Sequence, residues 1–151
     1  MVVNGRWEGV GSDRRAIARL LERASAEPHA AEMSVVAELV SDDRLRVVVK
    51  MNRIDSVLRA SRLTTWVAVV ESGLTTPVGR GENASKTLRN DRVVRRLERL
   101  SGLEPMQGGA TGFLEFVLED GWRRDQLSVV AFLQEADSLR VRAAAESVLA
   151  R

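Results

Sequence analysis

The first 24 residues constrain the fold of this chain more than any other stretch. Asn4-Gly5 stands between two short runs, Val2-Val3 and Arg6-Trp7. Asn-Gly is a preferred pair for the centre of a type I′ turn, because both central positions of that turn need a positive φ. The stretch therefore predicts two short antiparallel strands that pair around a tight hairpin turn.

A helix is predicted directly after this hairpin. Ser12 is suited to cap a helix N-terminus, and Asp13 suits the positive end of the helix dipole. Pro28 disfavours continuation of the helix beyond residue 26. Four apolar residues recur at helical spacing: Ile17, Leu20, Leu21 and Ala24. A hairpin and one helix cannot bury a core alone, so this module needs further strands from elsewhere in the chain or from another chain.

After residue 32 the pattern changes to short strands separated by turn residues. The predicted strands are residues 33–40, 45–51, 63–70, 75–81, 113–118, 127–133 and 139–144. In the second of them, alternation predicts that Leu45, Val47, Val49 and Met51 share one buried face. Short strands at regular spacing are typical of a two-layer antiparallel sandwich. We therefore expect a strand-rich α+β chain, with a β-β-α module in residues 1–29 and a β-sandwich-like domain in residues 30–151.

The stretch from Asn90 to Leu103 is ambiguous between helix and strand. Val93, Val94, Leu97 and Leu100 fit a helical stripe with arginines on the opposite side. The adjacent pair of β-branched valines favours an extended segment instead. Because periodicity favours the helix, we predict a helix over residues 90–103.

Two stretches carry a family resemblance. MVVNGRWEGVGSDRRAI at the start, and VGRGENASKTLRNDRVVRRLERL from Val78 to Leu100, resemble a family of secreted thioredoxin-like proteins, domain-of-unknown-function family 1223. The resemblance implies that residues 1–29 are the closing strand–strand–helix part of a thioredoxin-like fold, and it favours an extended segment over residues 90–103. The Cys-x-x-Cys half of the family pattern would lie before Met1. Members of the family are usually exported.

Composition excludes several classes of chemistry. The chain has 151 residues and no cysteine, so it can supply neither a thiolate nor a disulfide. A net charge of +2 is weak support for a nucleic-acid partner, and we expect neither nucleic acid nor a membrane to be the partner.

The sequence shows no export signal at Met1, which predicts a cytoplasmic protein as written, or a periplasmic or secreted one if the true start lies upstream. We expect no catalytic residue, cofactor or metal site.

Two groups of residues are candidate binding sites. The first is the loop of Gly79, Arg80, Gly81, Glu82 and Asn83, where two glycines let backbone N–H groups approach an anion and the arginine could clamp it. The same residues also suit a turn that merely holds a loop in place. The second is a row of arginines that could contact phosphates, Arg92, Arg95, Arg96 and Arg99, extended by Arg89. These arginines also suit ion pairs on a solvated face, and no aromatic residue interleaves with them for base stacking.

Three functions follow from these observations. The leading hypothesis is a non-catalytic binding or scaffolding domain, which meets a protein partner or a second copy through its N-terminal module. The alternative is a truncated part of a secreted thiol–disulfide redox protein. A third is a weak polyanion binder that uses the arginine row of residues 89–99.

Overall fold

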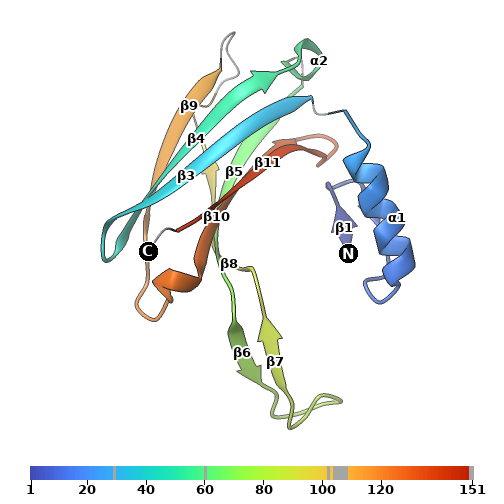
Figure 1. The fold of residues 1–151 in the computed structure, drawn as a ribbon, viewed down its shortest axis with the longest axis vertical. Helices are drawn as coiled ribbons and strands as arrows, with labels where there is room; N and C mark the ends of the chain where they lie inside the picture. The colour runs from blue at the N-terminus through green and yellow to red at the C-terminus, as the bar shows by residue number, and fades with distance from the viewer. Residues whose placement is uncertain (29, 60, 102, 104–108, 150–151) are drawn as a thin grey trace.

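The computed structural model describes residues 1–28, 30–59, 61–101, 103 and 109–149, apart from the side chain of Arg59. Figure 1 shows a β-sandwich, a module with one helix on one side of it, and a two-stranded arm that projects away from it. The elements in chain order are β1 (Val2–Val3), β2 (Trp7–Glu8), α1 (Arg14–Ser25), β3 (Ala31–Ser41), β4 (Arg44–Ile54), α2 (Ser56–Arg59), β5 (Leu63–Glu71), β6 (Leu74–Pro77), β7 (Thr87–Asn90), β8 (Val93–Leu100), β9 (Ala110–Val117), the 3-10 helix Arg124–Gln126, β10 (Leu127–Glu135) and β11 (Val141–Val148).

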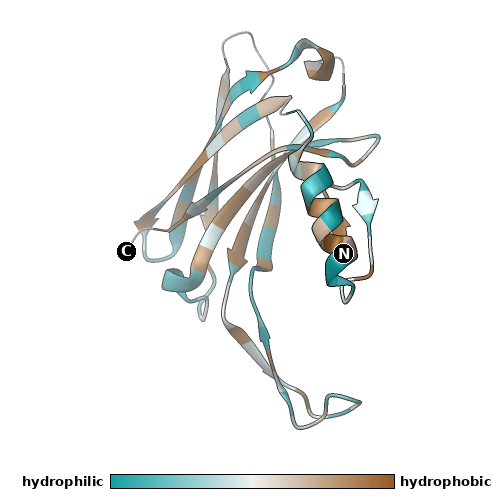
Figure 2. Ribbon diagram, turned by 45° about the vertical axis from the view of Figure 1, so that its right-hand side comes forward, coloured by the Kyte–Doolittle hydropathy of each residue, from teal (hydrophilic) through white to brown (hydrophobic). Residues whose placement is uncertain are grey.

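Two antiparallel sheets form the sandwich. One has the strand order β11-β10-β5-β8, and the other has the order β3-β4-β9. The main core lies between them, where Val47 and Val49 of β4 pack with Val67 and Val69 of β5 and with Val129 of β10, all with no exposed surface. In Figure 2 the apolar residues are concentrated along these strands. The strand-rich α+β architecture predicted from the sequence is thus confirmed. The division at residues 29 and 30 stays a prediction.

The predicted alternation in β4 is confirmed. Leu45, Val47 and Val49 are completely buried and Met51 nearly so, whereas Arg46 and Lys50 between them are exposed. The short strands at 33–40, 63–70, 113–118, 127–133 and 139–144 correspond to β3, β5, β9, β10 and β11. The predicted strand at 75–81 ends earlier, because β6 stops at Pro77.

The predicted helix over residues 90–103 is wrong, since Val93–Leu100 is strand β8. A register shift at Val69/Val70 of β5 places an extra residue, Arg95, in β8 between Val94 and Arg96. This bulge interrupts the alternation, so that Val94 and Leu97 lie three residues apart on one face. A spacing of three in a strand with a bulge resembles the spacing of a helix, which explains the error.

β6 and β7 form a separate two-stranded sheet that extends beyond β5 and β8. Residues 75–77 and 79–90 are all exposed. The sequence did not indicate β7 (Thr87–Asn90), because Leu88 is its only apolar residue and neither face is buried. The arm is anchored at its base, where Gly73 N donates to Asp91 Oδ1 at 2.7 Å and Arg92 N donates to Ser72 Oγ at 3.1 Å.

The N-terminal module has the predicted hairpin and helix. Asn4 and Gly5 have φ values of 49° and 65°, as a type I′ turn requires. The expected cap at Ser12 is wrong: Asp13 is the N-cap, and its Oδ1 accepts from Ala16 N at 2.9 Å. No described helix is long and apolar enough to cross a membrane.

Candidate functional site

The hairpin turn of the module is bonded to the sandwich. Val141 N at the start of β11 donates to Asn4 O at 2.9 Å. A Cβ atom on Gly5 would lie 2.0 Å from Leu139 O, so this contact requires a glycine. The residue pair that forms the turn therefore also places the module against the turn between β10 and β11.

An acidic side chain makes a second connection. The Glu27 carboxylate accepts from Arg6 Nη1 at 2.7 Å and from Arg140 Nη2 at 2.5 Å, and so it joins the hairpin to the end of β10–β11. The hydrogen bond from Arg140 is the largest cause of a lowered pKa of Glu27; burial opposes it, and the positive charges of Arg140, Arg6 and Arg142 lower the pKa further. The carboxylate is thus held ionised by cations from both parts of the chain.

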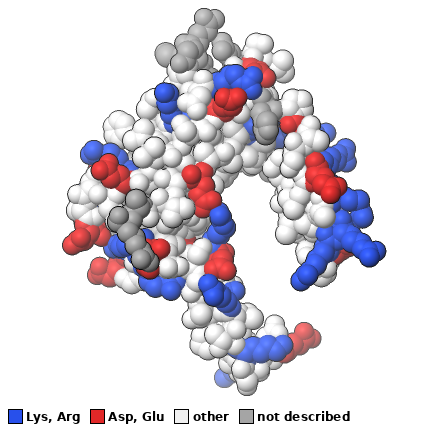
Figure 3. Space-filling model, in the orientation of Figure 1, with Lys and Arg blue, Asp and Glu red and all other residues white. Residues whose placement is uncertain are grey.

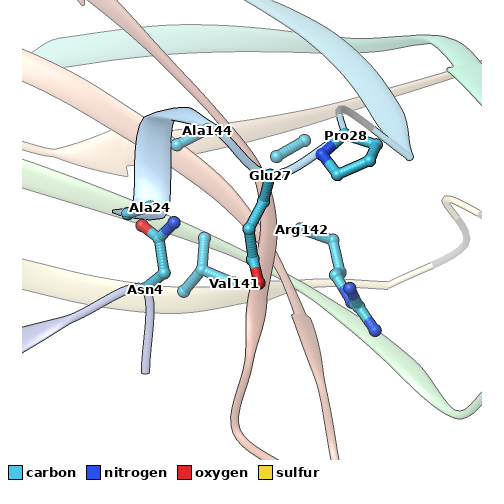
Figure 4. A pocket seen from close by; sticks show the side chains of 8 residues that line it. Asn4, Ala24, Glu27, Pro28, Val141, Arg142 and Ala144 are labelled. Atoms are coloured by element: carbon cyan, nitrogen blue, oxygen red, sulfur yellow. The ribbon is translucent and has the colours of Figure 1, made fainter. Parts of the chain in front are cut away.

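A pocket of about 220 Å³ lies at this connection. Its lining residues come from the hairpin turn, the end of α1 and β11: Asn4, Ala24, Glu27, Pro28, Val141, Arg142, Ala143 and Ala144. Figure 4 shows the Glu27 side chain extending between Val141 and Arg142. Glu27 is bound by two arginines and Arg142 is bound to Glu135, so both charged groups of the pocket are already paired within the chain. Among the described residues, no group of three or more His, Asp or Glu could hold a metal ion.

One face of the module is open. Val3 and Ile17 are buried between hairpin and helix, but Val2 is 65% exposed and Val10 is 71% exposed. Val2 lies across from Glu8 on the hairpin, on the face away from α1. Met1, Val2, Glu8, Gly9 and Val10 line a shallow groove there. Figure 3 shows that the molecule is hollowed between this module and the sandwich with its arm.

The candidate loop of Gly79, Arg80, Gly81, Glu82 and Asn83 lies at the tip of the arm, and all five residues are exposed. Gly81 has a φ of +87°, and Ala84 N donates to Gly81 O at 2.9 Å. Asn83 accepts through its backbone oxygen from Lys86 N and through Oδ1 from Lys86 Nζ, both at 3.1 Å. The described residues bring no second element against this loop. An anion-binding role for it stays a prediction.

The arginine row does not form one cationic surface. Arg92 bonds Glu146 across the outer face of the four-stranded sheet, at 2.9 Å. Arg96 bonds its neighbour Glu98 at 3.0 Å, and Arg89 lies 3.8 Å from Asp91. Arg99 lies opposite Trp66. Because strand β8 divides these side chains between two faces, the geometry favours ion pairing over a phosphate track. The anion contacts stay untested.

Arg95 belongs to a buried cluster that sequence reasoning missed. Glu71 ends β5 and has no exposed surface; its Oε2 lies 3.2 Å from Arg95 Nε, and its Oε1 accepts from Arg123 Nε at 3.1 Å. Arg95 also lies over the Trp122 ring, 5.2 Å from its centroid. The only signal in the sequence was an acid directly after the apolar run of residues 66–70. His29, the single histidine, lies outside the described residues.

A family model described as a protein of unknown function, DUF1223, matches residues 1–134. The chain belongs to this family. The predicted resemblance is thereby confirmed for DUF1223, and no curated protein matches the chain.

Two solved structures show the same fold as this DUF1223 chain. HBP35 of Porphyromonas gingivalis has a TM-score of 0.66 at 17% identity, over 89% of this chain and 46% of that chain. A domain of the outer membrane lipoprotein Omp28 from Porphyromonas gingivalis has a TM-score of 0.54 at 15% identity, over 80% of this chain and 95% of that chain. The chain thus spans less than half the length of HBP35. At these identities the likeness extends to the fold alone.

Proposed function

We propose that this DUF1223 chain is a non-catalytic binding domain in which the β-sandwich holds the β1–β2–α1 module in place for a protein partner. The partner adds strands and an apolar face to the open side of the module, and so completes a thioredoxin-like fold. One observation carries the proposal: Met1, Val2 and Val10 are 60%, 65% and 71% exposed on a hairpin whose turn is fixed to the sandwich.

The energetics of the module support this role. Burying a large aliphatic side chain contributes about 1.5–3 kcal/mol, so leaving Val2 and Val10 in water forgoes a substantial stabilisation. The turn is meanwhile held by Val141 N and by the Glu27 bridge. A module that is fixed at its hairpin turn and has an exposed apolar face is preorganised, which lowers the cost of binding.

The redox alternative is closely related to this proposal. With no cysteine among these 151 residues, a thiolate for disulfide exchange has to come from outside them. In that case these residues are the closing part of a thioredoxin-like fold in a secreted redox protein, and its Cys-x-x-Cys half supplies the chemistry. We expect no insulin reduction by the purified chain above an albumin blank. An exported parent protein is in keeping with the likeness to a domain of Omp28, which is an outer membrane lipoprotein.

Dye binding and sedimentation test the open face. The full chain, the variant V2S/V10S and the control V57S/V148S are compared; the two control valines are 81% and 71% exposed elsewhere. We expect the wild type and the control to bind a hydrophobic dye, and V2S/V10S to bind less of it, with the dye on the remaining apolar surfaces unchanged. A second copy as the partner would appear as self-association that V2S/V10S alone abolishes. Equal dye binding by all three proteins would contradict the proposal.

A further inference from the structure

A second apolar surface lies on the three-stranded sheet, on the face away from the core. Val36 of β3 lies across from Val48 of β4, and Val48 lies across from Phe113 of β9. Val36 is 62% exposed and Phe113 is 71% exposed. The result is an apolar row across the sheet, which ends at its largest and most exposed member.

Phe113 stands on an edge strand. Among the described strands, β9 pairs with β4 alone, and Figure 1 shows it at the margin of the sandwich. Leu118 N donates to Asp43 O at 2.7 Å, so Asp43 and Leu118 form a hydrogen-bonded pair. Leu45 and Phe116 are the pair two positions along in the same register. Hydrogen-bonded and non-bonded pairs alternate in an antiparallel ladder, so the even-numbered residues of β9 bond to β4.

The odd-numbered residues consequently turn their N–H and C=O groups to the open edge. These residues are Thr111, Phe113, Glu115 and Val117. Edge strands of soluble proteins are usually protected by Lys or Pro, and β9 has neither. Its one charge, Glu115, is neutralised by Arg46 at 3.0 Å. The edge is thus competent to pair with another strand.

The other edges of the sandwich differ from this one. The edge strands β3 and β11 contact each other, and Ala37 N of β3 donates to Ser147 Oγ of β11 at 3.1 Å. β8 is also an edge, but it carries four charged residues within eight positions: Arg95, Arg96, Glu98 and Arg99. β9 is therefore the edge with both free backbone groups and an apolar neighbour row.

We propose that two copies of the chain associate through β9, with the strand pairing antiparallel to itself about Phe113. In this register Phe113 lies opposite Phe113 of the second copy, and Glu115 lies opposite Thr111. No like charges face each other, so the strand is complementary to itself. The two sheets become one six-stranded sheet, and the two apolar rows join through an aromatic pair.

The association is tested on the full chain by sedimentation equilibrium. We expect the wild type to dimerise at about 100 µM or below, and Phe113→Arg to weaken the dimer by about tenfold or more. Val94→Arg is the matched control, because Val94 is 56% exposed on the other edge strand, β8. Phe113 and Val94 are both exposed, so circular dichroism should show that the variants remain folded.

Charge substitutions at Thr111 test the register of the β9 pairing. Thr111→Lys places a cation opposite Glu115 of the second copy, and Thr111→Glu places an acid there. We expect the dimer constants of the two variants to differ by about fivefold, with the lysine variant tighter. The proposal is overturned if the wild type stays monomeric, if Phe113→Arg and Val94→Arg weaken the dimer equally, or if the two Thr111 variants have equal dimer constants. This association does not rest on the N-terminal module, so V2S/V10S should leave it unchanged.

Discussion

Replacing Glu71 by Gln should be the most damaging polar substitution in the sandwich. Glu71 has no exposed surface, and it lies between the guanidinium groups of Arg95 and Arg123. Its Oε1 also accepts from the backbone N of Arg123 at 3.3 Å. The variant keeps the size of the side chain but removes the charge that both arginines contact.

The expected loss follows from burial. Removing one partner of a buried ion pair costs about 3–5 kcal/mol, because the remaining charge is left without compensation. Here the Arg95 and Arg123 side chains are 30% and 46% exposed, so water can reach them after the change. We therefore place the loss in Glu71→Gln at or below the lower limit of that range, at about 2–3 kcal/mol, which corresponds to roughly 4–12 °C in Tm for a domain of this size.

Urea denaturation followed by circular dichroism measures the loss. Glu98→Gln is the matched control, since its ion pair with Arg96 is solvated, and such pairs contribute about 0–1 kcal/mol. Equal unfolding free energies for the two variants would show that the buried cluster contributes no more than a surface pair, and the argument from burial would fail.

Three further predictions concern the backbone and the charge of the connection. Gly5→Ala should destabilise the chain by about 2 kcal/mol or more, because φ is +65° and its Cβ would meet Leu139 O at 2.0 Å; a Tm equal to that of the wild type contradicts this. Gly81→Val should cost about 1–2 kcal/mol more than Ala84→Val, since φ is +87° with no crowding; equal denaturation midpoints would refute it. The lowered pKa of Glu27 means that its contribution is complete above its ordinary pKa of 4.5 and is lost as the pH falls through the lowered value. The difference in stability between wild type and Glu27→Gln should therefore shrink toward low pH, and a difference independent of pH would contradict the assignment.

The elements that were predicted correctly are those whose local sequence preferences agree with the way they pack in the folded chain. Asn4-Gly5 has the conformation that its residues favour, and β4 alternates because one face lies on the core and the other in water. β8 was mispredicted because its bulge at Arg95 breaks that alternation. A bulge depends on the neighbouring strand, and nothing within Val93–Leu100 reveals it.

The candidate sites were harder to predict for a similar reason. The arginine row lies within one short stretch of the sequence, but β8 distributes its arginines over two faces, and the partners Glu71 and Glu146 lie on other strands. Phe113 gains significance only because Val36 and Val48 lie beside it in the sheet. Contacts between distant segments thus decide which charges are free and which apolar residues form a surface.

The two open surfaces should differ in the partners that they accept. β1 and β2 have two residues each, so an added strand could form few backbone hydrogen bonds there. Affinity at the module must therefore come from apolar contact with Val2 and Val10, which requires a partner with a folded, complementary face. β9 has eight residues and four that turn both backbone groups outward, so an extended strand is enough. A short peptide with the sequence of residues 110–117 should consequently compete for β9, and it should leave dye binding at the module unchanged.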